Sequence, residues 1–124
     1  MKNLNFITIF LYLIFFTNFV FGNDYKEKKM SHYIIVSLVS KENKKEDLKK
    51  AMVDLKRNLP KVNGCLSVSI FQDKSNSKNF TIVEEWDSSK SHRTHIDNIT
   101  KSGDLDKILQ LLEKPLSGID YLKL

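Results

Sequence analysis

The chain has 124 residues, with 20 Lys and Arg against 15 Asp and Glu and a formal net charge of +5 at pH 7. This length suits a single domain with one core. The basic residues are spread along the chain and form no stripe interleaved with aromatic residues, so we expect no nucleic-acid partner. The single cysteine, Cys65, excludes a disulfide within the chain, and its place between Gly64 and Leu66 favours burial over a catalytic thiol.

The N-terminal segment has the order of a secretory signal peptide. Lys2 is followed by a stretch rich in Phe, Ile and Leu, and Gly22 supplies a small residue at its end. We therefore predict a signal peptide over residues 1–22, a disordered linker over residues 23–32 and a folded domain over residues 33–124, with export to the periplasm or beyond. An uncleaved segment would anchor the domain, which is the only membrane association expected. A start at Met30 is a further alternative.

The first half of the domain contains a strand, a helix and a second strand. Residues 33–39 are rich in β-branched side chains and apolar on both alternating faces, which predicts a strand covered on both sides. Asn43, with Glu46 three residues later, predicts a capped helix that Pro60 ends. A second strand opens at Gly64 and alternates apolar residues with serines.

The second half repeats this order with a strand, a helix and a strand. A polar loop over residues 73–79 leads to a third strand over residues 80–86, as in an antiparallel hairpin. Asp87 or Ser88 can cap the next helix, which breaks near Gly103 and resumes until Pro115. Residues 119–124 predict a last strand. The order β-α-β-β-α-β predicts an α+β, ferredoxin-like fold with a four-stranded antiparallel sheet.

A candidate site lies where the third strand meets the second helix. Phe80, Ile82, Glu84 and Trp86 share one face of the strand, so a carboxylate lies in line with three large apolar groups. Glu84 should therefore be hydrogen-bonded, protonated, or part of a pocket lining. On the following helix, His92 and His95 fall on or beside the inward apolar stripe. Both are in the first part of that helix, close to the end of the third strand.

These residues resemble the antibiotic biosynthesis monooxygenase (ABM) superfamily, small dimeric α+β barrels that include quinol monooxygenases. The resemblance covers residues 33–124 and is strongest at Gly64 and Cys65, through residues 79–88, and at His95. It implies a homodimer packed sheet to sheet, in agreement with the two apolar faces of residues 33–39. It also implies a pocket for a small aromatic or quinol-like substrate that reacts with oxygen without a cofactor or a metal.

The resemblance assigns roles to three residues, Glu84, Trp86 and His95, and His92 joins them only through its place on or beside the inward stripe of the same helix. His95 and Glu84 are the expected catalytic residues, with His95 as the base and Glu84 orienting the imidazole or the substrate hydroxyl. We assign substrate binding to Trp86, as an apolar wall, and to His92. The chain would then be an exported, cofactor-independent monooxygenase of a quinol or phenolic compound.

Several alternatives stay open at this stage. A non-oxygenase isomerase or binding protein of the same fold, or a dimeric domain without activity, would explain the same pattern. Trp86 would then belong to the core, and Glu84 would cap the helix or pair with Lys90. The haem-degrading branch fits less well, because residues 33–39 lack its Asn and residues 104–106 lack its His. His92 and His95 lack a third partner for zinc at useful spacing.

Overall fold

The computed structural model describes residues 30–124 of the chain. The predicted signal peptide and most of the predicted linker lie outside the described residues. The elements are β1 (His32–Val39), the short 3₁₀ turn η1 (Glu42–Lys44), α2 (Lys45–Asn58), η2 (Leu59–Lys61), β2 (Cys65–Gln72), β3 (Asn79–Trp86), α3 (Ser89–Ser102), α4 (Asp104–Leu109) and β4 (Ser117–Leu122). This order confirms the predicted α+β, ferredoxin-like fold. Among residues 30–124, none of the helices has the length and apolar character needed to span a bilayer.

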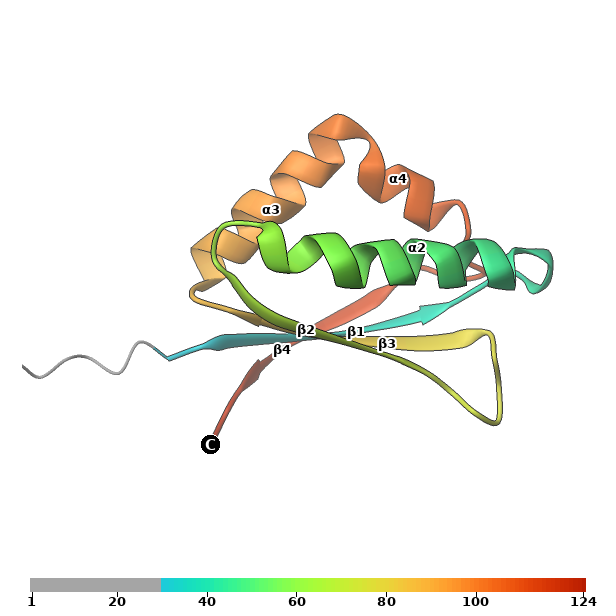
Figure 1. Cartoon of the computed structure of the whole chain (residues 1–124), viewed down its shortest axis with the longest axis horizontal. Coiled ribbons are helices and arrows are strands. Elements are labelled where there is room, and N and C mark those ends of the chain that lie inside the picture. The colour runs from blue at the N-terminus through green and yellow to red at the C-terminus, as the bar shows by residue number, and fades with distance from the viewer. Residues whose placement is uncertain (1–29) are drawn as a thin grey trace, which may run out of the picture.

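The four strands form one antiparallel sheet in the order β2-β3-β1-β4. The helices all cover the same face of this sheet, and the opposite face carries none of them (Figure 1). The central strand β1 places His32 opposite Trp86 of β3 and opposite Leu122 of β4. The register therefore brings the start of β1, the end of β3 and the end of β4 together at one end of the sheet, measured along the strands.

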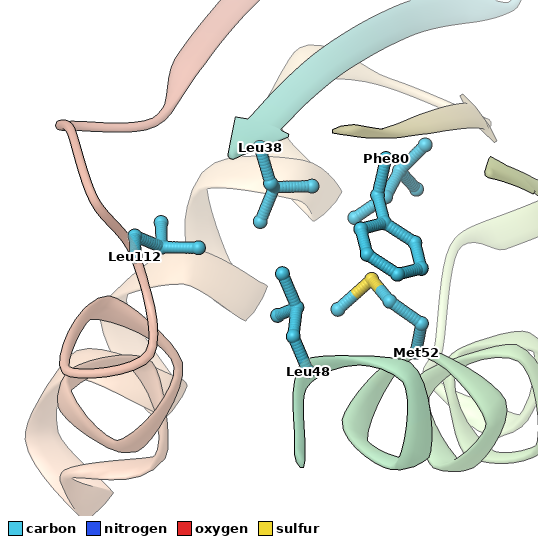
Figure 2. Close-up of a cluster of buried hydrophobic side chains, with 6 residues drawn as sticks. Leu38, Leu48, Met52, Phe80 and Leu112 are labelled. Atoms are coloured by element: carbon cyan, nitrogen blue, oxygen red, sulfur yellow. The ribbon is translucent and has the colours of Figure 1, made fainter. Parts of the chain in front are cut away.

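The core lies between the sheet and the helices. Every second residue of β3, from Phe80 to Trp86, is buried, in agreement with the predicted alternation. From α2, Leu48 and Met52 pack against Phe80 and Leu38, and these side chains point toward one another in Figure 2. Full burial of a side chain of this size stabilises the fold by about 1.5–3 kcal/mol relative to exposure.

The helix-free face of the sheet presents a second set of apolar side chains. Residues opposite one another in neighbouring antiparallel strands project to the same side. One row across this face runs Ser69, Val83, Ile35 and Ile119 from β2 to β4. Ile119 is 52% exposed in the single chain. The open face therefore leaves apolar surface in contact with water.

Some local predictions were wrong. Asn43 does not cap α2: it lies inside η1, so the chain is already helical when α2 begins, and the cap position is Lys44 without a side-chain hydrogen bond. The last helix does not continue to Pro115, because α4 ends at Leu109 and Leu112 instead pairs with Ser40 in an isolated bridge.

The remaining boundaries differ by one or two residues. The first strand begins at His32, one residue into the predicted linker, and the last strand spans Ser117–Leu122 instead of residues 119–124. Such shifts are the normal uncertainty of element ends.

Candidate functional site

The site is built around a buried hydrogen bond at the end of β3. Glu84 and Trp86 lie on the helix-covered face, and Trp86 has 0% of its surface exposed. The Trp86 Nε1–H donates to Glu84 Oε2 at 2.7 Å. A hydrogen-bond partner was one of the outcomes that the sequence predicted for this carboxyl, and the indole N–H is that partner. Trp86 thus has apolar contacts on its rings and a polar contact at its one donor.

A compact polar junction sets the direction of α3. The predicted cap is confirmed at Ser88, whose Oγ accepts a hydrogen bond from the Ser91 backbone N–H. Asp87 accepts from the Ser91 hydroxyl at 2.6 Å, and its backbone N–H donates to the Gly64 carbonyl at 2.8 Å. Gly64 has a φ of +89°, which the absence of a Cβ permits. The junction therefore fixes the first turn of α3 against the start of β2.

The first two turns of α3 lay two imidazole rings against the indole. The ring of His92 lies 5.4 Å from that of Trp86 between centroids, tilted by 59°. The ring of His95 lies 5.3 Å away at 30°, in a stacked arrangement. Spacing of three residues on a helix places both rings on one side. The structure thus brings together all four residues singled out in the sequence.

The polar contacts differ from the assigned roles in one respect. Glu84 Oε2 lies 3.9 Å from Nε2 of His92, whereas His95 meets the indole. A carboxylate that orients an imidazole would in this conformation orient His92. The catalytic roles of His95 and Glu84, and the substrate-binding roles of Trp86 and His92, remain predictions.

Burial changes the proton affinity of this cluster in two directions. It raises the pKa of the Glu84 carboxyl above its ordinary value of 4.5, and the hydrogen bond from Trp86 partly opposes that rise. It lowers the pKa of both His92 and His95 below 6.5. Loss of hydration disfavours the charged form of each group, so a carboxyl and an imidazole respond with opposite signs. The cluster therefore favours neutral side chains.

A third histidine, which the sequence reasoning missed, completes the cluster. The ring of His32 lies 6.1 Å from that of His92, and its Nε2 lies 3.7 Å from Asp120 Oδ2 of β4. All three histidines of the chain thus lie close together at the same end of the sheet. The sequence did hold one indication of this: His32 and Ile34 are two residues apart on a strand, so their side chains project to the same face. That signal required the β1–β3 register, which places His32 opposite Trp86.

A groove of about 550 Å³ opens beside this cluster. Three short segments line it: residues 30–32 before and within β1, residues 87–89 at the start of α3, and residues 120–122 at the end of β4. The volume lies within the range of small-molecule pockets. None of the four predicted site residues belongs to this lining, and His32 connects the groove to them through its ring contact with His92.

Two further points concern metal binding and the single cysteine. Within residues 30–124, no three His, Cys, Asp or Glu residues are grouped so that they could hold a metal ion. Cys65 is partly buried against the cluster of Ile34, Leu59 and Trp86, in line with the expectation of a packed thiol. Burial and the nearby Glu84 charge raise the pKa of this thiol, which disfavours the reactive thiolate.

Comparison with solved structures gives the same fold. A candidate antibiotic biosynthesis monooxygenase from Nitrosomonas europaea superposes with a TM-score of 0.69 at 20% identity, covering 78% of this chain and 93% of that one. A conserved protein from Methanosarcina mazei superposes with a TM-score of 0.69 at 20% identity, covering 80% of this chain and 98% of that one. A second candidate antibiotic biosynthesis monooxygenase, from Deinococcus radiodurans, superposes with a TM-score of 0.66 at 21% identity, covering 74% of this chain and 91% of that one. At these identities the likeness establishes the fold alone.

The sequence itself was compared with families and with curated proteins. No curated protein matches the chain. The family model described as "Antibiotic biosynthesis monooxygenase" matches residues 31–98. This stretch contains β1 through most of α3, and with it Glu84, Trp86, His92 and His95. It is more than half of the chain, and the chain therefore belongs to the antibiotic biosynthesis monooxygenase family.

Proposed function

We propose that this protein is an exported, cofactor-independent monooxygenase that acts on a quinol or phenolic small molecule. One observation carries the proposal: two half-buried imidazoles pack on a buried indole whose N–H holds a buried carboxyl. Family membership supports the reaction type, and the groove beside the cluster supports a small-molecule substrate.

The chemistry needs a base that is neutral near neutral pH. A neutral imidazole accepts the proton of a phenolic hydroxyl and leaves an electron-rich phenolate, which can react with dioxygen. In the complete reaction, one oxygen atom enters the substrate, and the other leaves as water with two hydrogens from the quinol. Burial lowers the pKa of His92 and His95, so these rings are neutral and able to accept a proton where a solvated histidine would still be partly charged.

Oxygen uptake with a panel of hydroquinones tests this function. The expected result is consumption of one dioxygen per quinol, with a product mass that is two hydrogens lower and one oxygen higher than that of the substrate. If His95 is the base, His95→Gln should lower kcat by about 10²-fold or more, and a much smaller loss would place the base elsewhere in the histidine cluster. Binding of hydroquinones without oxygen uptake would contradict the monooxygenase and favour a binding protein or isomerase.

Export is a separate part of the proposal, based on the sequence of residues 1–22. Production of the full chain in a host with a secretory pathway should release a mature protein that begins after Gly22. N-terminal sequencing of the exported fraction checks this. Recovery of the intact chain in membranes would indicate an anchor instead, and recovery in the cytosol would refute export.

We further propose that the open face of the sheet pairs with that of a second copy. Phe71, Ile119 and Tyr121 are between 46% and 58% exposed on strands that already supply an apolar row across this face. Burying this surface removes apolar area from water, which is worth about 25 cal/mol per Å². An antiparallel sheet with one uncovered apolar face commonly marks an interaction site.

A charge placed in this face should separate the copies. Ile119→Glu is expected to convert a dimer to a monomer in light scattering at micromolar concentration. Val53→Glu is the matched control, because Val53 on α2 is also 52% exposed but lies on the helical layer. A monomeric wild-type chain, or equal effects of both variants, would refute sheet-to-sheet pairing.

A further inference from the structure

We propose that the groove between the start of β1 and the end of β4 is the ligand site, and that His32 accepts the proton of a bound phenolic hydroxyl there. The ligand class rests on the proposed function, whereas the place and the proton acceptor rest on the geometry below. The proposal makes His32, in place of the predicted His95, the base in contact with the ligand.

The first argument is access. His32 contributes to the groove lining and also reaches the histidine cluster, through its ring contact of 6.1 Å with His92. Trp86 is fully buried, and the Glu84 side chain is 10% exposed. In this conformation a ligand in the groove meets His32 before it can meet the indole or the carboxyl.

The second argument is charge. When a phenolic O–H bond breaks, its proton passes to the imidazole of His32 and the electron pair stays on the ligand oxygen as a phenolate. The imidazolium formed lies 3.7 Å from the Asp120 carboxylate, which stabilises it, and the phenolate is held beside that same cation. Asp120 is 70% exposed, so solvent screens this pair and its contribution is modest.

The third argument is the neighbouring imidazole. The groups that face His32 are Asp120 from β4 and His92 from α3, and Asp87 lines the same groove. Burial first, and then the positive charge on His32, lower the pKa of His92. Two cations at this separation repel, so a proton taken up by His32 from the ligand disfavours protonation of His92.

The remaining lining suits a phenolic ring. Leu122 and Met30 offer apolar side chains for the ring. Ser89 also lines the groove and carries a hydroxyl that can bind a second ligand oxygen such as that of a hydroquinone. A few polar groups in an otherwise apolar concave surface are typical of small-molecule sites.

The experiment uses 4-nitrophenol, whose phenolate absorbs visible light and whose neutral form does not, titrated into the full chain at fixed pH. Wild-type protein is expected to increase the phenolate absorbance as the ligand binds. His32→Gln should abolish this increase and weaken binding about tenfold, while Asp120→Asn should weaken it about two- to fivefold, as for an exposed pair. Asp106→Asn on α4 is the matched control and should leave the titration unchanged.

Oxygen uptake with hydroquinone separates this inference from the proposed function. If quinols are oxidised and His32→Gln lowers kcat about 10²-fold, both stand. If nothing is oxidised but the phenolate signal depends on His32, the inference stands and the monooxygenase does not. If quinols are oxidised and His32→Gln changes neither kcat nor the phenolate signal, while the variant keeps the wild-type near-ultraviolet circular dichroism, the inference is overturned.

Discussion

Replacing the buried carboxyl by an amide should change how stability depends on pH. Glu84→Gln keeps the shape of the side chain and an oxygen that can accept the Trp86 N–H, but it removes the titrating group. In the folded wild type, burial raises the pKa of Glu84 above 4.5. A carboxyl whose folded pKa is raised contributes stability that is fully present below the unfolded pKa and is lost as the pH rises through the folded pKa.

The magnitude follows from proton linkage. Between pH 4.5 and the folded pKa, the unfolded chain has released the Glu84 proton and the folded chain still holds it. Wild-type stability therefore falls, relative to Glu84→Gln, by up to about 1.36 kcal/mol for each pH unit in this window. Above the folded pKa the difference stays constant, and well below pH 4.5 it is independent of pH.

The assay is urea unfolding of both proteins at half-unit steps from pH 3.5 to pH 8, followed by far-ultraviolet circular dichroism. The expected signature is a difference in unfolding free energy that changes in favour of Glu84→Gln as the pH rises. Glu46→Gln on the exposed side of α2 serves as the control and should show no comparable slope. A flat difference for Glu84→Gln, or one with the opposite slope, would show that burial does not control this carboxyl.

Three further variants test the packing that positions the site. Gly64→Ala should cost at least about 1–3 kcal/mol in urea unfolding, because its Cβ would lie 2.4 Å from the Ser91 Cβ at a φ of +89°; a neutral result would refute the close approach. Ser88→Ala should cost about 1 kcal/mol by loss of the α3 cap, and unchanged stability would refute that cap. Leu48→Ala should cost about 2–5 kcal/mol, against less than about 0.5 kcal/mol for exposed Val53→Ala, and similar costs for the two would contradict the described core.

The fold could be predicted because its signals are local. Alternation along residues 80–86 and helical spacing before Pro60 and after Ser88 depend on neighbours in sequence, and tertiary packing reinforced them. The cap at Asn43 failed for a related reason: a favourable local motif lost to the 3₁₀ turn in which that residue lies. The end of α4 failed because Leu112 gains more from burial under the sheet than from continuing the helix.

The site could be predicted only in part, because its contacts join distant strands. Glu84 and Trp86 are two residues apart on one strand, and their shared face was readable. His32 and Asp120 are separated by most of the chain, and only the β1–β4 register places them at the same end of the sheet. A groove formed by three separate segments leaves no continuous pattern in the sequence.

The burial that raises the pKa of Glu84 acts on the neighbouring imidazoles of α3 with the opposite sign. Burial lowers the pKa of His92 and His95 below 6.5, so in the folded chain these rings stay neutral as the pH falls below that value. Their contribution to stability is present above pH 6.5 and is lost as the pH falls through their folded pKa, opposite in sign to that of Glu84. Around neutral pH both effects favour the uncharged forms of Glu84, His92 and His95, so a positive charge is costly to hold among these three side chains. That charge is best held where a carboxylate and solvent can reach it, which is at His32 beside Asp120 and not against the indole.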